Sequence, residues 1–275
     1  MILQLEIRQV LRLKRFLRYL KDFSCTVTVM FNDVSKHVSF HMYTPLVTSF
    51  IQLKLANCDL QTVRTVDHAW EAQQTYNVEL FELYMVLNFA TSSDDCMVLT
   101  CKDDCVQVDI RSRGRLKTYF IKSIVSNDPS HRSILHADVQ TTMFDTKIRV
   151  DTSSFLGQLQ RVESLDVVGV RLVVHTDGCL WLFIAMECGS GWLSVRSIAI
   201  RSDSRPVKKS LCLGTFSVIE IRSVVQGLHI YGDEHIITGF DTSGHTPIQF
   251  TCRSPSNELI YACHAPYHSS RPAGD

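Results

Sequence analysis

Six positively charged side chains lie within fourteen positions near the start of the chain, in the stretch RQVLRLKRFLRYLK, with no acidic residue between them. The whole chain has 28 Lys and Arg against 28 Asp and Glu, so this cluster is a local excess. Like charges on neighbouring helical turns repel by about 0.2–0.5 kcal/mol per pair, whereas a merely solvated face usually mixes acids with bases. We therefore expect a polyanionic ligand, and nucleic acid fits best. The candidate nucleic-acid-binding residues are Arg8, Arg12, Lys14, Arg15, Arg18 and Lys21.

Two pairs of aspartates suggest a different chemistry, because paired carboxylates hold divalent metal ions in nucleases. Asp94-Asp95 and Asp103-Asp104 flank the strand-like segment CMVLTC. Aspartate is also a common turn residue, and both pairs stand where a hairpin needs a turn. We favour the turn interpretation and predict no catalytic residue.

The ten cysteines do not form a recognisable metal or disulfide pattern. No C-x-x-C pair occurs, and the spacing of Cys96, Cys101 and Cys105 matches no zinc site. Many cysteines stand among Val, Leu, Ile and Thr, as small apolar side chains do in strands. The opening residues become charged too soon for a signal peptide, and no apolar run approaches the ~20 residues of a membrane span. We expect a reduced intracellular protein without metal, cofactor or membrane contact.

Most of the first half alternates apolar and polar residues with a period of two, which predicts β-strands. The exceptions are two helical patterns, at 8–23 and, more weakly, at 82–91. In the first of them the apolar residues share one arc and the six cations lie opposite. The predicted strands are 25–32, 37–43, 47–55, 76–81, 97–101, 106–110 and 116–125.

The second half repeats this order of strand, helix, strands, helix and strands. A helix is expected to open at Ser153 or Ser154, a Gly-Ser-Gly turn at 189–191, and a second helix over 218–231. We interpret the chain as two similar α+β domains, which is a repeat of fold without obvious repeat of sequence. The predicted boundaries are 1–125 for the first domain, 126–135 for a connector, 136–266 for the second domain and 267–275 for a flexible tail.

This order, with a basic helix near the start, resembles the sliding DNA clamp family, whose best-known member is proliferating-cell nuclear antigen. Met42–Leu55 resembles a strand pair of the first clamp domain, and Glu258–Pro266 resembles the final strand, which ends in Ala-Pro. The resemblance covers about 1–266. It implies an α+β sliding-clamp fold, with two similar domains that each place antiparallel sheets outside and two helices inside, toward a channel for duplex DNA.

Within this family the second half most resembles the Rad-nine-type subunit of the heterotrimeric checkpoint clamp, often called nine-one-one. Gly239–Cys252 is similar to its Phe-Asp-x-x-Gly-x-Pro segment, with one extra residue before Pro247. The segment 116–124 is similar to its Lys-Thr-His strand, with Tyr119 in place of the histidine. The long C-terminal tail of that subunit has no counterpart after Asp275.

The resemblance implies a non-enzymatic nuclear protein that tethers DNA-damage checkpoint and repair proteins. Its partners would be double-stranded DNA, two other clamp subunits and an ATP-dependent clamp loader, since common phosphate-loop motifs are missing here. Edge strands at 116–125 or near 172–188 would close the ring. Arg161 and Arg222 would join the DNA-binding residues. A partner-peptide pocket would be lined by Met42, Leu46, Pro129, Ala265 and Pro266.

Three alternatives stay open at the level of sequence. The chain could be a replicative or viral DNA polymerase processivity factor of the same fold, which would assemble with itself. It could be a metal-dependent nuclease that uses the paired aspartates, or a module that binds acidic ligands in general, including acidic peptides.

Overall fold

The structure is a computed structural model of the 275-residue chain, and all structural statements below concern the residues it describes. None of the helices in this part of the chain is long and apolar enough to span a membrane. The described residues are 2–21, 23–32, 37–43, 49–55, 60–66, 73–101, 105–122, 144, 146–165, 167, 169–175, 180–186, 189–195, 197–199, 211–231, 235–240, 248–253 and 257–263.

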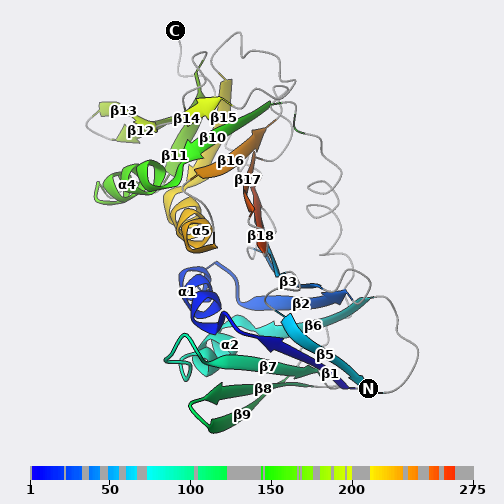
Figure 1. The fold of residues 1–275 in the computed structure, drawn as a ribbon. Helices are drawn as coiled ribbons and strands as arrows, with labels where there is room; N and C mark the ends of the chain where they lie inside the picture. Colours follow the sequence, from blue (N-terminus) through cyan, green and yellow to red (C-terminus); the bar gives the residue numbers. More distant parts are fainter. Residues whose placement is uncertain are drawn as a thin grey trace.

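The two halves contain the same elements in the same order, as Figure 1 shows. The first half consists of β1 (Ile2–Ile7), α1 (Val10–Leu20), β2 (Thr26–Asn32), β3 (His37–Tyr43), β4 (Ser49–Leu55), β5 (Leu60–Val66), β6 (Gln73–Glu79), α2 (Leu80–Leu87), β7 (Cys96–Cys101), β8 (Cys105–Ser112) and β9 (Arg115–Lys122). The second half consists of β10 (Thr146–Asp151), α4 (Thr152–Glu163), β11 (Gly169–Val174), β12 (Leu180–Met186), β13 (Gly189–Val195), β14 (Ser197–Ala199), β15 (Leu211–Ser217), α5 (Val218–Tyr231), β16 (His235–Phe240), β17 (Ile248–Arg253) and β18 (Asn257–Cys263).

The strands form three antiparallel sheets, and their pairing repeats as well. The order is β5-β1-β7-β8-β9 in the first sheet and β13-β12-β11-β15 in the last. The large sheet between them has the order β14-β10-β16-β17-β18-β4-β3-β2-β6. Every pairing of the first half, such as β8 with β9, has its counterpart in the second, such as β17 with β18. The predicted repeat of two similar α+β units is therefore visible in the topology.

The halves are joined by β18 and β4, which pair antiparallel along their full lengths. The four helices of the described residues lie in one row, in the order α4, α5, α1 and α2, along one side of the molecule, and strands of the large sheet lie to the right of α5 and α1 in the view of Figure 1. Buried residues of both halves form a single apolar core under this row.

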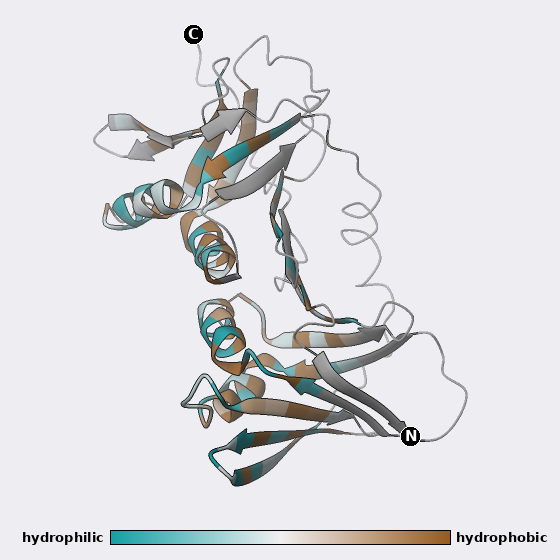
Figure 2. Ribbon diagram, viewed as in Figure 1, coloured by the Kyte–Doolittle hydropathy of each residue, from teal (hydrophilic) through white to brown (hydrophobic). Residues whose placement is uncertain are grey.

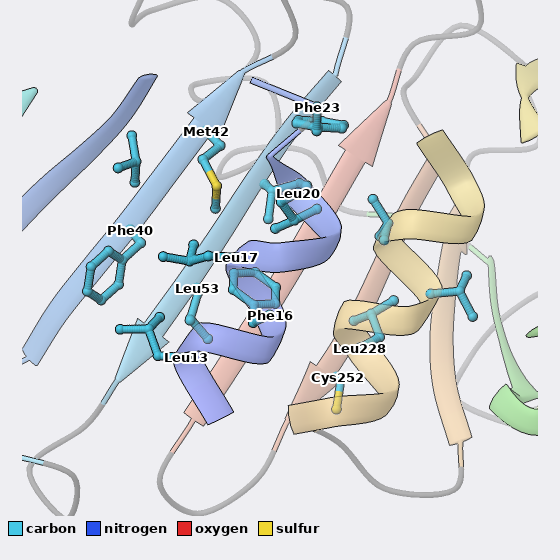
Figure 3. Close-up of a cluster of buried hydrophobic side chains, with 14 of the residues drawn as sticks. Leu13, Phe16, Leu17, Leu20, Phe23, Phe40, Met42, Leu53, Leu228 and Cys252 are labelled. Carbon is cyan, nitrogen blue, oxygen red and sulfur yellow. The ribbon is translucent and has the colours of Figure 1, made fainter. Parts of the chain in front are cut away.

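Helix α1 packs on the sheet through five fully buried side chains at helical spacing, namely Val10, Leu13, Phe16, Leu17 and Leu20. Burying a side chain of this size stabilises the fold by roughly 1.5–3 kcal/mol. Hydrophilic and hydrophobic residues alternate around the helix axis (Figure 2). Figure 3 shows the buried side chains of α1 against β3, β4 and α5. The cations consequently face away from the sheet.

Helices α1 and α5 cross closely because α5 has a glycine at the contact. A Cβ atom built on Gly227 would lie 2.9 and 3.0 Å from the Cε2 and Cδ2 atoms of Phe16. Phe16 is only 1 % exposed, so its ring has little room to move. The absence of a side chain at Gly227 therefore sets the distance between the two halves.

Glu220 ties the first turn of α5 to β4, since the Ser49 hydroxyl donates a hydrogen bond to its Oε2 at 3.2 Å. Burial raises the pKa of Glu220 above its ordinary 4.5, and the Ser49 hydrogen bond only partly opposes this. Between the ordinary and the raised pKa the folded chain binds more protons than the unfolded one. Stability from this group is thus gained as the pH falls through that window and lost as it rises.

We expect Glu220→Gln to raise the free energy of unfolding at pH 7, because the variant buries no charge there. It should also flatten the rise in stability that the parent protein shows on acidification from pH 7 toward the ordinary glutamate range. Urea unfolding at a series of pH values measures both effects. A variant that keeps the full pH dependence of the parent would show that another group causes it.

Several elements differ in detail from the sequence prediction. Strands β1 and β5 were not predicted, and α2 begins at Leu80, two residues earlier than expected. Helix α4 begins at Thr152 because Asp151 caps it, its Oδ1 accepting the Ser154 N–H at 2.6 Å. The predicted Gly-Ser-Gly turn is the start of β13, where Gly189 pairs with Met186. The connector 126–135 and the tail 267–275 lie outside the described residues.

Candidate nucleic-acid interface

Four of the six cations near the start of the chain are exposed, either on α1 or directly beside one of its ends. They are Arg8, Arg15, Arg18 and Lys21. The spacing of the last three places them on consecutive turns of the helix. Arg8 lies just before α1, and its Nε is 3.6 Å from Glu6 Oε1. An exposed pair at this distance is worth little, so all four side chains can reach a phosphate.

The other two cations hold neighbouring helices instead. Arg12 Nε donates a hydrogen bond to the main-chain oxygen of Ile230, in the last turn of α5, at 2.7 Å. Lys14 Nζ donates to the main-chain oxygens of Ala90 at 3.0 Å and Asn88 at 3.4 Å, just beyond α2. Helix C-termini carry partial negative charge, so a cation there is stabilising. Arg12 and Lys14 therefore fix α5 and α2 on either side of α1.

A basic groove of about 590 Å³ opens where α1 begins and α5 ends. Two arginines of its rim, Arg8 and Arg15, are exposed, and none of the described residues that line it is acidic. A groove with cations on its walls and no carboxylate focuses positive potential, which suits a phosphate backbone. The lining residues are Arg8, Gln9, Leu11, Arg12, Arg15, Ser93, His229 and Ile230.

The predicted cations of the second half do not extend this surface equally. Arg161 is exposed in the last turn of α4. Arg222 of α5 forms an ion pair with Glu163 of α4, which neutralises its charge. The positive surface is therefore concentrated on α1, at the middle of the helix row.

The first aspartate pair forms a turn. Asp94 is exposed, whereas Asp95 is 1 % exposed and its Oδ2 accepts the main-chain N–H groups of Thr91 at 2.7 Å and Ser92 at 2.9 Å. Burial alone would raise the pKa of Asp95, but hydrogen bonds from Ser112 and from these two N–H groups outweigh it, and the pKa is lowered. A carboxylate committed to main-chain donors organises the loop after α2.

Among the described residues, no group of three or more His, Cys, Asp or Glu side chains is placed to hold a metal ion. The second aspartate pair, Asp103-Asp104, lies outside them. Cys25, Cys96 and Cys212 are free thiols.

Of the residues predicted to line a partner-peptide pocket, only Met42 lies in the described part of the chain. Met42 has no exposed surface, and Figure 3 shows it in the core beside Leu20 and Phe40. It packs between β3 and α1 and does not line a pocket, because its position in β3 points toward the helix layer. Leu46, Pro129, Ala265 and Pro266 lie outside the described residues.

Sequence reasoning missed the groove residues that come from other elements. Ser93 lies in the loop after α2, and His229 and Ile230 end α5. These residues are distant from α1 in the sequence and lie beside it only in the folded chain. The one signal in the sequence was a basic residue, His229, in the last turn of a predicted helix.

The fold corresponds to that of known sliding clamps. No family model matches the sequence, and a comparison with curated proteins finds no match either. The PCNA2–PCNA3 complex from Sulfolobus tokodaii is similar with a TM-score of 0.71 and 13% identity, over 94% of this chain and 98% of that one. Proliferating Cellular Nuclear Antigen from Entamoeba histolytica is similar with a TM-score of 0.73 and 11% identity, over 96% and 99% of the two chains.

These similarities define the class to which the architecture belongs: an α+β fold of two similar domains, with antiparallel sheets on one side and two helices per domain on the other. The chain has the sliding-clamp fold, as the sequence predicted.

Proposed function

We propose that the chain is a non-enzymatic subunit of a ring-shaped sliding clamp that encircles duplex DNA without base specificity. The observation that carries the proposal is the row of helices on one side of the molecule, with the exposed cations of α1 at its middle. Arginine and lysine side chains on an otherwise smooth helix surface contact phosphates without reading bases, which is what movement along DNA requires.

Closure of the ring is supported by two strands that end their sheets, β9 and β13. Unpaired edge strands are sites for pairing with another chain. Strands β11 and β12, which span most of the predicted segment 172–188, are interior strands with partners on both sides. In the ring, β9 of one subunit pairs with the edge strand of the next that corresponds to β13.

Unlike neighbours fit the charge distribution better than three identical subunits. Of the described helices only α1 is strongly basic, and Arg222 is neutralised by Glu163. A ring of different subunits can supply the remaining positive charge from its other members. The resemblance of Gly239–Cys252 and of 116–124 to the Rad-nine-type subunit supports a place in a nuclear checkpoint clamp, which an ATP-dependent loader opens and which tethers checkpoint and repair proteins.

The test is retention on closed DNA. The complex that contains the chain is purified from cells, loaded on a nicked circular plasmid and washed with concentrated salt, which screens phosphate contacts. We expect the complex to stay on the circle and to be released when a restriction enzyme linearises it. Equal loss from circular and linear DNA would contradict encirclement. Assembly of the purified chain with itself into a ring would instead favour a polymerase processivity factor.

A further inference from the structure

Ser93 lies at the boundary between two pockets of opposite charge. It belongs to the loop that connects α2 to β7, and it is exposed. The basic groove described above is lined by Ser93 together with three arginines. A second pocket, of about 370 Å³, shares Ser93 and Arg8 with the groove but is otherwise lined by Glu6, Asp94, Asp95 and Cys96. One hydroxyl group is therefore placed between a cluster of cations and a cluster of carboxylates.

The loop is held by its main chain in a way that leaves Ser93 at the groove. Asp95 is buried, and its Oδ2 accepts the main-chain N–H groups of Thr91 and Ser92. The Ser92 hydroxyl oxygen accepts the Asp94 N–H at 3.3 Å. The residues on both sides of Ser93 thus take part in the turn. Among the described residues that line the basic groove, Ser93 is the only one with a hydroxyl group.

The sequence beside Ser93 has the charge pattern of a protein kinase substrate. Asp94 and Asp95 follow it directly, and the sequence contains no Lys or Arg from 65 to 101. Kinases select substrates partly by the charges beside the acceptor hydroxyl, and acidic neighbours fit a kinase with a basic substrate groove. Asp94 is exposed, so a kinase can contact it.

The reaction needs only ATP and the kinase. The Ser93 Oγ forms a bond to the γ-phosphorus of ATP, the bond from that phosphorus to the bridging oxygen breaks, and ADP leaves. The hydroxyl proton passes to the catalytic base of the kinase. The product is a phosphoserine at the edge of the basic groove.

A phosphate on Ser93 has a strong electrostatic preference for the groove. Phosphoserine carries a charge of about −1.5 to −2 at pH 7 and three strong acceptor oxygens. The carboxylates of Glu6 and Asp94 repel it from the acidic pocket, whereas Arg8 and Arg15 are exposed at the groove. Arginine and phosphate form short, charge-assisted and often bidentate hydrogen bonds. The phosphate would therefore occupy two of the cations that the unmodified chain offers to DNA.

We propose that Ser93 is a phosphorylation site for an acid-directed protein kinase, and that its phosphate closes the basic groove to DNA. The modified chain keeps its fold, because Ser93 lies in a loop, but it holds DNA more weakly. The proposal rests on the proposed function only in taking the groove as a DNA contact. Phosphorylation then acts as a switch that keeps the subunit off DNA until the phosphate is removed.

The site is tested on the isolated chain, without DNA. Casein kinase II, which is acid-directed, is incubated with the folded chain and labelled ATP, and the acceptor residue is located by peptide mass spectrometry. We expect labelling of Ser93, none at that position in Ser93→Ala, and labelling about tenfold slower in Asp94→Asn. A folded chain that is labelled only elsewhere, or not at all, would overturn the assignment of the site.

The place of the phosphate is tested with phosphoserine introduced at position 93 by genetic code expansion. Phosphorus NMR follows its second pKa, which is ordinarily about 6. We expect this pKa to be lower in the folded chain than in urea, because neighbouring arginines favour the dianion. Replacing both Arg8 and Arg15 by Gln should remove the difference, with circular dichroism to check the fold. Equal values in the folded and unfolded parent chain would overturn the placement in the groove.

The effect on DNA is measured in the purified complex with fluorescent duplex DNA at several salt concentrations. Phosphoserine at position 93 should lower the slope of log affinity against log salt by about 0.9 for each of the two occupied arginines, and the affinity about tenfold. Phosphoserine in place of Thr91 is the matched control, since this exposed residue of the same loop lines neither pocket. Equal effects at both positions would refute closure of the groove. The NMR measurement contains no DNA, so its failure is distinguished from failure of plasmid retention.

Discussion

Replacing Gly227 by Ala is expected to destabilise the protein, although alanine is normally the better helix residue. The new methyl group would lie 2.9 Å from a ring atom of Phe16, which is itself buried between the halves. Overpacking of a core costs about 1–3 kcal/mol, and alanine recovers about 1 kcal/mol of helix propensity. We expect a net loss of up to about 2 kcal/mol in the free energy of unfolding.

Gly157 provides the matched control, because a Cβ there meets no atom within 4 Å. Gly157→Ala in α4 should therefore stabilise the protein by about 0.5–1 kcal/mol, through helix propensity and a less flexible unfolded chain. Urea unfolding of both variants gives the comparison. Combining Gly227→Ala with Phe16→Leu should recover part of the loss, since the two sites are in contact. If both glycine variants gained stability equally, the close crossing of α1 and α5 would be refuted.

Neutralising the exposed cations of α1 is expected to weaken DNA association strongly. In the proposed ring, replacing Arg15, Arg18 and Lys21 by Gln would remove three phosphate contacts. The slope of log affinity against log salt should fall by about 0.9 for each contact, and the affinity near physiological salt by about two orders of magnitude. Titrations of fluorescent duplex DNA at several salt concentrations measure both quantities.

Lys14→Gln tests whether the position of a cation matters or only the net charge of α1. Lys14 lies on the same helix as the exposed cations, but its Nζ already donates to the carbonyl oxygens of Ala90 and Asn88. We expect this variant to keep the salt slope and to lower the thermal midpoint, since the end of α2 loses its cap. A slope that responds to Lys14 as strongly as to Arg18 would show that net charge alone matters. A slope that responds to neither would remove α1 from the DNA interface.

The repeat, the long helices and the basic face were predictable because each has a strong local signal. The apolar positions of α1 recur at helical spacing, and those residues are the buried ones. Strand β5, LQTVRTV, was missed because it has few apolar residues. It is recognised as a strand only by its pairing with β1 in the structure. Strand β1 was missed because it runs directly into the basic segment.

Which cations bind a neighbouring helix and which are exposed could not be predicted from sequence. Arg12 and Arg15 differ by less than one helical turn, yet one bonds a carbonyl of α5 and the other is exposed. The difference depends on where α5 ends, more than two hundred positions away. Met42 was misjudged for a similar reason, since alternation says which strand residues share a face but not which face the helices cover.

The pairing of β4 with β18 also has a consequence for how the protein is made. Lys54 is synthesised about two hundred residues before its strand partner Glu258. Until then the early half has a completed small sheet and an open edge at β4. Such non-local closure slows folding and leaves a strand available for wrong partners. Until β18 has been made and has paired, the edge of β4 is therefore a site at which the nascent chain can associate with a wrong partner.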